Sequence, residues 1–334
     1  FFATMWRFAM QDKLKWPLIL VLASVVFLFL SAGSEENDLW SARFQKQYGV
    51  YALPLPSSLD FAGEKVPLQD YDVRERLDRE LLVNTYFQSQ TLLFLKRINK
   101  YFPMIEPILR RNGIPADFKY LPLVESGLAH VVSPKNAVGF WQFTESTAKQ
   151  YGLEVNAEVD ERYHIEKSTE AACRFLNDSY RLYRSWTMAA ASYNMGRKAL
   201  NQQLQRQRVN NYYDLLLGEE TSRYIFRILA LKLIITDPEA YGFHLRNEDL
   251  YPPVAYKFVS LDSSVTDFTS WAHQFGINYK ILKLHNPWLR NNKLTNQAKK
   301  KYVIKIPAEG YGEYEYPFRL NYDSLPVNGN DTIQ

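Results

Sequence analysis

The sequence predicts a mainly α-helical protein that carries a small module of mixed strands and helices at its carboxy-terminal end. Three observations lead to this prediction. Apolar residues recur at three-to-four spacing over residues 70–245, no comparable run of alternating strands occurs before residue 250, and the composition changes after Pro252 and Pro253. The 334 residues, of which 46% are hydrophobic, suffice for one large core or two smaller ones.

The first element is an amino-terminal segment that is typical of export. Nineteen uncharged residues separate Lys15 from Glu35 and follow three basic residues, so we expect the chain after Glu35 to be exported. Residues 1–34 are either a cleaved signal peptide or a signal anchor, because the apolar run lies near the lower limit for spanning a bilayer and ends in small residues that a signal peptidase accepts. An anchor would make the inner membrane a partner.

The next residues divide into a leader and a helical domain. Residues 35–69 contain prolines and glycine among short apolar pieces, which predicts an irregular leader without a regular helix. Residues 70–250 form the predicted helical domain, in which one helical stretch covers residues 77–98 and a second covers residues 102–111, ended by Asn112, Gly113 and Pro115. Further helices are expected over residues 119–125, 144–151, 165–183, 185–194, 197–206 and 222–235.

The last predicted unit is the small module of residues 251–307. Short strands over residues 255–261 and 302–306 flank helices over residues 265–275 and 279–284, which gives the order βααβ. Residues 308–334 are rich in Tyr, Asn and Gly, and we expect this tail to be partly disordered.

The composition excludes several kinds of site and partner. Cys173 is the single cysteine, so intrachain disulfides and multi-cysteine metal sites are excluded, and its apolar neighbours favour a buried side chain over a nucleophile. The 5 histidines form no i, i+4 pair and no HExxH motif, so we expect no metal and no other cofactor. The net charge of +4 comes without a basic stripe, which argues against nucleic acid as a partner.

One carboxyl group stands beside apolar residues in the segment 118–153. Glu125 follows Leu121 and precedes Phe140 and Trp141. A carboxyl held against such side chains keeps its proton to a higher pH, because desolvation disfavours the charged form, and a general acid needs that property. The residue types alone, however, favour an ordinary capping or surface carboxylate.

A series of ordered motifs runs through the helical domain. The motifs are Glu125-Ser126-Gly127, Ser133-Pro134, Gly139-Phe140-Trp141-Gln142-Phe143, Asp160-Glu161-Arg162, Ala190-Ala191-Ser192-Tyr193-Asn194-Met195-Gly196 and Glu220-Thr221 with Tyr224. Together they resemble the lytic murein transglycosylases, and among them the membrane-bound D type. The resemblance covers about residues 75–245 and implies a goose-type, lysozyme-like helical domain. The sequence departs from the family pattern at Ser192, where alanine is more usual, and at Thr144.

The resemblance implies cleavage of the β-1,4 bond between N-acetylmuramic acid and N-acetylglucosamine in peptidoglycan. Glu125 matches the single catalytic position, which first protonates the glycosidic oxygen while the substrate's N-acetyl group stabilises C1. The carboxylate then deprotonates the C6 hydroxyl, which closes a 1,6-anhydro ring within the same sugar. Peptidoglycan glycan strands are thus the expected partner, and the periplasm or cell envelope is the expected location.

The same motifs imply a set of substrate-binding residues. Hydroxyl and amide groups hydrogen-bond N-acetyl groups, and aromatic rings stack on sugars. The alternative roles are loop caps for the serines and core positions for the tyrosines. The implied set is Ser126, Ser133, Gln142, Tyr193, Asn194 and Tyr224, and the last is expected to place its hydroxyl near Glu125.

Residues 256–307 resemble a LysM repeat more faintly. LysM modules bind glycan chains, which would tether an enzyme to its polymer and raise its effective concentration. The usual Gly-Asp-x-Leu opening is replaced by Leu261-Asp262-Ser263-Ser264, so a structural appendage remains an equal alternative. Two other functions also stay open for the whole chain: a muramidase that hydrolyses the same bond, and an inactive peptidoglycan-binding scaffold.

Overall fold

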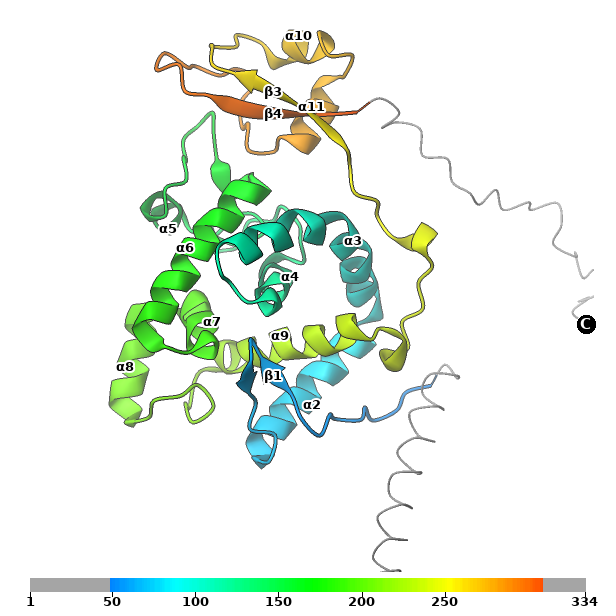
Figure 1. Ribbon diagram of the computed structural model, residues 1–334, viewed down its shortest axis with the longest axis vertical. Helices are drawn as coiled ribbons and strands as arrows, with labels where there is room; N and C mark the ends of the chain where they lie inside the picture. Colours follow the sequence, from blue (N-terminus) through cyan, green and yellow to red (C-terminus); the bar gives the residue numbers. More distant parts are fainter. Residues whose placement is uncertain (1–48, 309–334) are drawn as a thin grey trace, which may run out of the picture.

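The computed structural model describes residues 49–308, in which a helical domain carries a small module on one side (Figure 1). Short 3-10 helices cover Ala116–Tyr120, Glu161–Tyr163, Glu239–Tyr241 and Asn247–Asp249. The strands and α-helices are β1 (Asp60–Phe61), β2 (Glu64–Lys65), α2 (Tyr71–Tyr86), α3 (Gln88–Arg111), α4 (Leu121–Ser126), α5 (Glu145–Gln150), α6 (Ile165–Tyr183), α7 (Trp186–Met195), α8 (Arg197–Gln207), α9 (Glu219–Thr236), β3 (Tyr256–Leu261), α10 (Phe268–His273), α11 (Tyr279–His285) and β4 (Tyr302–Pro307).

These elements confirm the predicted fold class. The helical domain holds eight of the α-helices in the described part of the chain, and the βααβ order appears in the module after residue 255. The expected signal peptide or anchor at residues 1–34 and nearly all of the expected disordered tail lie outside residues 49–308. None of the helices within residues 49–308 combines the length and the apolar character needed to cross a bilayer.

The prediction was wrong about where the first long helices divide. The stretch 77–98 is broken at Phe87, which separates α2 from α3, while α3 continues from Gln88 to Arg111 without the expected break near residue 100. Helix α3 even contains Pro103 and Pro107, each of which removes a backbone hydrogen bond. Seven residues of α3 are nevertheless buried, and this packing compensates for the lost bonds.

The described part of the leader, residues 49–69, contains no helix, as predicted, but it forms a short hairpin that belongs to the core. Strands β1 and β2 form a short antiparallel hairpin, and the Phe61 ring is completely buried against Phe118 at a centroid distance of 5.3 Å. The carboxylate of Glu64 accepts hydrogen bonds from the backbone N–H groups of Trp186 and Thr187. The hairpin therefore caps the start of α7, where unpaired N–H groups favour an anion.

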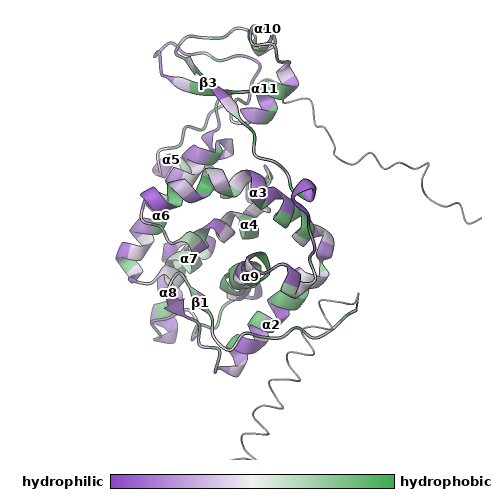
Figure 2. Ribbon diagram, turned by 45° about the vertical axis from the view of Figure 1, so that its right-hand side comes forward, coloured by the Kyte–Doolittle hydropathy of each residue, from purple (hydrophilic) through white to green (hydrophobic). Residues whose placement is uncertain are grey.

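Helix α9 runs through the middle of the helical domain, where Figure 2 shows α2, α3, α4 and α7 around it. It packs against α2, α4 and α7. Tertiary packing therefore fixes this helix on several sides. A side chain on α9 that points toward Glu125 is held in place by this packing. Its buried residues are Tyr224, Ile225, Phe226, Ile228, Leu229, Ala230, Leu231 and Ile234.

The module closes on its own hydrophobic core. Strands β3 and β4 pair antiparallel, with Tyr256 opposite Pro307 and Leu261 opposite Tyr302. Phe268 of α10 and Leu282 of α11 are completely buried in this core. The same cluster includes Val138, Val159 and Tyr163 of the helical domain, so the two units share buried apolar surface.

Polar contacts also fix the module to the segment 154–166 of the helical domain. The Asp160 N–H donates to the Trp288 carbonyl at 2.9 Å, and the Arg290 N–H donates to the Glu158 carbonyl at 2.8 Å. The Lys305 ammonium pairs with Glu166 at 2.5 Å; the Lys305 side chain is buried and that of Glu166 is half-buried. The module is thus attached through backbone pairing and buried charge, as a fixed part of the molecule.

Candidate active site

Glu125 lies in the last turn of the short helix α4. Pro122 stands in the first turn, where its missing N–H costs no hydrogen bond, and Gly127 ends the helix with φ = +61°. A Cβ at Gly127 would come within 2.7 Å of the Phe94 ring, so the glycine also permits close packing on α3. The Ser126 hydroxyl donates to the carbonyls of Pro122 and Phe140, which ties the end of α4 to the following loop.

The Glu125 carboxyl meets the hydroxyl of Tyr224 from α9. The Tyr224 hydroxyl donates to Glu125 Oε1 at 2.5 Å. Burial raises the pKa of Glu125 to about 7, while the hydrogen bond from Tyr224 and the charge of Arg227 act in the opposite direction and the charge of Glu220 adds to the rise. This carboxyl therefore keeps its proton near neutral pH and has a fixed neighbour on one oxygen.

Tyr193 approaches the same carboxyl from α7. Burial raises the pKa of Tyr193 well above its usual value, and the charge of Glu125 contributes to the rise. Its hydroxyl donates to the Trp141 carbonyl at 2.7 Å, and the Trp141 indole N–H donates to Thr169 at 2.8 Å. Asn194 follows at the half-buried end of α7. These bonds hold three parts of the chain together around Glu125: helix α7, helix α6 and the loop that follows α4.

Ser133 and Gln142 belong to the loop between α4 and α5. The Ser133 hydroxyl accepts a hydrogen bond from the Ala137 N–H, and the Gln142 amide donates to the carbonyls of Val131 and Gly139. Gln142 adopts φ = +47°, which is unfavourable for a residue with a Cβ and often marks a functional position. Both side chains therefore shape this loop.

Arg162 fixes the loop between α4 and α5 through hydrogen bonds to its backbone. Its guanidinium donates to the carbonyls of Asn136 and Phe143 and makes two hydrogen bonds with Asp160. Gly139 passes so close that a Cβ there would lie 2.2 Å from the Arg162 carbonyl oxygen. The Asp160-Glu161-Arg162 motif signalled this segment in the sequence, but its contact with the loop appears only in the fold.

The structure thus separates the expected site residues into groups. Tyr224 contacts Glu125 directly, and the charge of Glu125 acts on Tyr193. Ser126, Ser133 and Gln142 make hydrogen bonds with the backbone of the loop or of α4.

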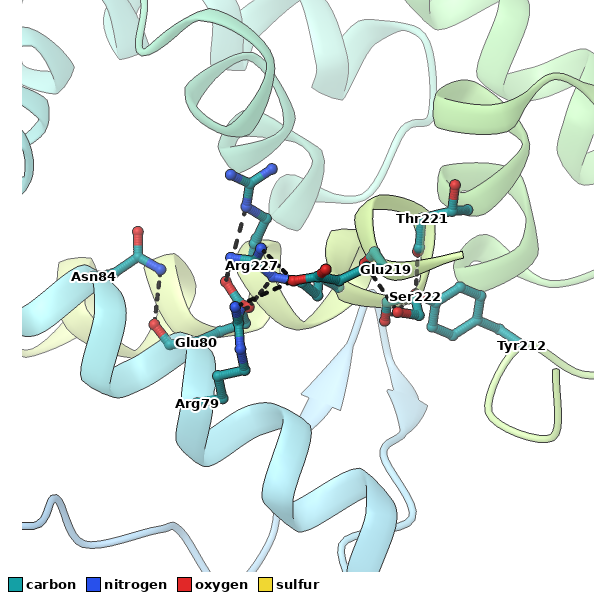
Figure 3. A network of polar contacts seen from close by, with 9 residues as sticks. Arg79, Glu80, Asn84, Tyr212, Glu219, Thr221, Ser222 and Arg227 are labelled. Carbon is teal, nitrogen blue, oxygen red and sulfur yellow. Dashed lines mark hydrogen bonds and ion pairs between the residues drawn. The ribbon is translucent and has the colours of Figure 1, made fainter. Parts of the chain in front are cut away.

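Sequence reasoning missed a buried carboxylate beside this site, Glu80 of α2. Its side chain is almost completely buried and is bound by Arg79 of α2 and by Arg223 and Arg227 of α9 (Figure 3). The helical pattern of α2 gave a signal, since Glu80 falls on the buried face next to Leu77 and Leu81. Its two partners on α9 lie more than 140 residues away along the chain, so their pairing with Glu80 could not be read from the sequence.

Comparison with known proteins adds two matches to families. Residues 103–215 match the transglycosylase SLT domain, a range that includes Glu125 and all of the expected binding residues except Tyr224. Residues 257–310 match the C-terminal LysM-like domain of soluble lytic transglycosylases.

The curated relatives carry related names. The membrane-bound lytic murein transglycosylase D of Escherichia coli K12 is 28% identical over 243 residues, which cover 70% of this chain and 52% of the relative. The protein of the same name from Escherichia coli O6:H1 gives the same values. The chain spans about half the length of these relatives. It therefore contains a transglycosylase SLT domain followed by a LysM-like domain of the kind found at the end of soluble lytic transglycosylases.

Proposed function

We propose that this chain is a peptidoglycan lytic transglycosylase in which Glu125 is the single acid and base. The observation that carries the proposal is the hydrogen bond of 2.5 Å from Tyr224 to a carboxyl whose pKa burial raises to about 7. The SLT match and the names of the relatives support the class of reaction.

The proposed reaction proceeds in two proton transfers. Protonated Glu125 gives its proton to the glycosidic oxygen as the bond from that oxygen to C1 of muramic acid breaks. The acetamido oxygen of the same sugar stabilises the positive charge at C1. The Glu125 carboxylate then takes the proton of the C6 hydroxyl while the C6 oxygen bonds to C1, so no water is consumed and Glu125 ends protonated.

Tyr224 has a defined part in this scheme. Its hydroxyl occupies Oε1 of Glu125, which leaves Oε2 to carry the proton that is transferred. The hydrogen bond stabilises the carboxylate and so assists the first transfer and moderates the pKa. Tyr224 is thus a positioning residue that acts through Glu125.

The other expected residues are proposed as substrate contacts. Tyr193 and Asn194 lie in the last turn of α7, where the charge of Glu125 acts on Tyr193. Ser133 and Gln142 stand on the loop that Arg162 holds. Ser126 fixes the loop to α4 through the Phe140 carbonyl, so its removal should loosen the site.

We also propose the arrangement of the whole chain. Residues 70–250 would form the catalytic domain, residues 251–307 the LysM-like module that meets peptidoglycan, and residues 1–34 the segment that exports or tethers the protein to the cell envelope. The relative's name, which describes a membrane-bound protein, supports this location.

Mass spectrometry of released muropeptides tests the proposed reaction. The full chain in mild detergent would be incubated with purified peptidoglycan beside Glu125→Gln, which keeps the size and removes the acid. We expect anhydro-muropeptides, about 18 Da lighter than reducing ones because no water is added, and their loss in the variant.

Two other outcomes would contradict the proposal. Reducing-end products would identify a hydrolase on the same fold, in which Glu125 acts with an activated water. Binding of peptidoglycan by both proteins without release of any product would identify a scaffold.

A further inference from the structure

We propose that Arg227 binds a carboxylate of the acidic peptide that muramic acid carries, and that buried Glu80 positions Arg227 for this contact. The proposal rests on the proposed function and assigns the part of the substrate beside the bond that is cleaved. It makes the site selective for an anionic glycan polymer over a neutral one.

The position of Arg227 places a cation beside the catalytic carboxyl. Arg227 lies three residues after Tyr224 on α9, which puts the two side chains on neighbouring positions of one helix face. Its charge lowers the pKa of Glu125 and also acts on Tyr224. Its side chain is 41% exposed, so a ligand can reach it.

The guanidinium of Arg227 is only loosely engaged within the protein. Its closest contact to Glu80 joins Nε to Oε2 at 3.8 Å, and Figure 3 shows the Nη atoms turned away from Glu80. Among the residues that the structure describes, no ion pair joins Arg227 to Glu125, Glu219 or Glu220. The edge of the guanidinium that forms paired hydrogen bonds with a carboxylate is therefore available.

The charges around Glu80 explain why Arg227 makes no close ion pair with it. Arg223 binds Glu80 through Nε at 2.6 Å and Arg79 binds it at 2.6 Å, and both also reach Glu219 at 3.5 Å. Two carboxylates thus face three arginines, and the third arginine makes the longest contact. A structural role alone would not require Arg227, since Arg79 and Arg223 already neutralise buried Glu80.

The ligand follows from this geometry and from the proposed substrate. A guanidinium fork favours a planar carboxylate in a bidentate arrangement. Each muramic acid bears a lactyl-linked peptide whose carboxylates hang beside the sugar ring that Glu125 would attack. A neutral polymer of N-acetylglucosamine lacks any such group.

A binding experiment tests the proposal without relying on turnover. Full-length Glu125→Gln and the double variant Glu125→Gln/Arg227→Gln would be titrated onto two preparations of peptidoglycan. In one, free amines are acetylated and carboxylates are left intact, and in the other the carboxylates are then also converted to amides. Both preparations keep the same glycan, so only the negative charge differs.

We expect Glu125→Gln to bind the preparation with intact carboxylates about tenfold or more tightly than the amidated preparation, as is typical of a charge-assisted hydrogen bond. The double variant should bind both preparations equally, at the weaker level. Glu125→Gln/Arg79→Gln is the matched control, because Arg79 also pairs with Glu80 and is similarly exposed at 46%, and it should keep the preference.

Equal loss of binding to both preparations on removal of Arg227, or no preference in Glu125→Gln, would overturn the assignment. Kinetics on the preparation with intact carboxylates supply a second measurement. In it, Arg227→Gln should raise KM while kcat changes less than about twofold. Glu80→Gln should give the same pattern in weaker form if it positions Arg227. A wild-type protein that binds with the expected preference but releases no anhydro product would refute the proposed reaction and leave the Arg227 site intact.

Discussion

At the scale of single residues, the environment of Glu125 matters more than its identity. The residue is one of 36 acidic side chains, and what distinguishes it is burial beside the Tyr224 hydroxyl. Burial raises the pKa of Glu125 to about 7 because the charged form loses its hydration. Two predictions follow from this single property.

The first prediction concerns the pH dependence of the rate. The first step needs protonated Glu125, so kcat/KM should fall as the pH rises through about 7, by about tenfold per pH unit beyond it. Tyr224→Phe removes a hydrogen bond that lowers this pKa, so the fall should move to higher pH. The pH profile of anhydro-muropeptide release measures both effects, and a profile unchanged by Tyr224→Phe would contradict them.

The second prediction concerns stability. The pKa of Glu125 is raised in the folded state, so the folded protein loses stability as the pH rises from the unfolded value of about 4.5 to about 7 and loses no more above it. Glu125→Gln removes this loss. We expect the variant to gain up to about 3 kcal/mol over wild type between pH 4 and pH 8, as measured by denaturant unfolding. An equal difference at the two pH values would show that the carboxyl is not desolvated.

At the scale of elements, the loop between α4 and α5 depends on one close approach. Gly139 has φ = +78°, and a Cβ there would meet the Arg162 carbonyl at 2.2 Å. Arg162 in turn holds the carbonyls of Asn136 and Phe143. The backbone of the loop therefore rests directly on the segment that also contacts the module.

Gly139→Ala tests this dependence against a matched position. Gly113 has a similar φ of +68° but nothing within 4 Å of its Cβ direction. Gly113→Ala should cost about 1 kcal/mol from backbone strain alone, and Gly139→Ala about 2 kcal/mol more because backbone must shift. Thermal unfolding of both variants provides the measurement, and equal losses would mean that the loop yields freely.

At the scale of the whole molecule, the segment 154–166 joins the module to the active-site loop. Glu158, Asp160 and Glu166 contact the module, and Arg162 contacts the loop. The module and the active-site loop are therefore connected through direct contacts with one segment.

Lys305→Met tests the strength of this connection. The Lys305 ammonium faces Glu166 at 2.5 Å, and although burial alone would raise the pKa of Glu166, His164 and Lys305 together lower it to about 2. Loss of Lys305 should destabilise the protein by about 2 kcal/mol at pH 7, because the carboxylate remains half-buried without its ammonium partner. The depressed pKa means that this difference should shrink as the pH falls below about 4.5 toward 2.

Denaturant unfolding at pH 7 and pH 3 measures the effect of Lys305→Met, with Lys301→Met, at the exposed position just before β4, as the control. A loss of the same size in both variants, or one that does not change with pH, would show that the ion pair contributes nothing specific.

Local sequence signals were sufficient for most of the elements. The spacing of apolar residues predicted α6, α7 and α9 closely, and the βααβ order of the module was correct. The break at Phe87 and the unbroken course of α3 through Pro103 and Pro107 were not predictable, because burial of the α3 face outweighs the local preference of proline. The buried hairpin around Phe61 was missed because Phe118, against which the Phe61 ring packs, lies far along the chain.

The sequence by itself determined the helical class, the small terminal module and the motif around Glu125, because these depend on periodicity and on residues close together in the chain. The family resemblance already implied a Tyr224 hydroxyl near Glu125, and the structure shows the hydrogen bond between them across 99 positions. Only the tertiary structure decided that Glu80 gathers arginines from α9. The physical reason is that a pKa and an ion pair depend on distance and desolvation in space, which packing of distant helices sets and no local pattern encodes.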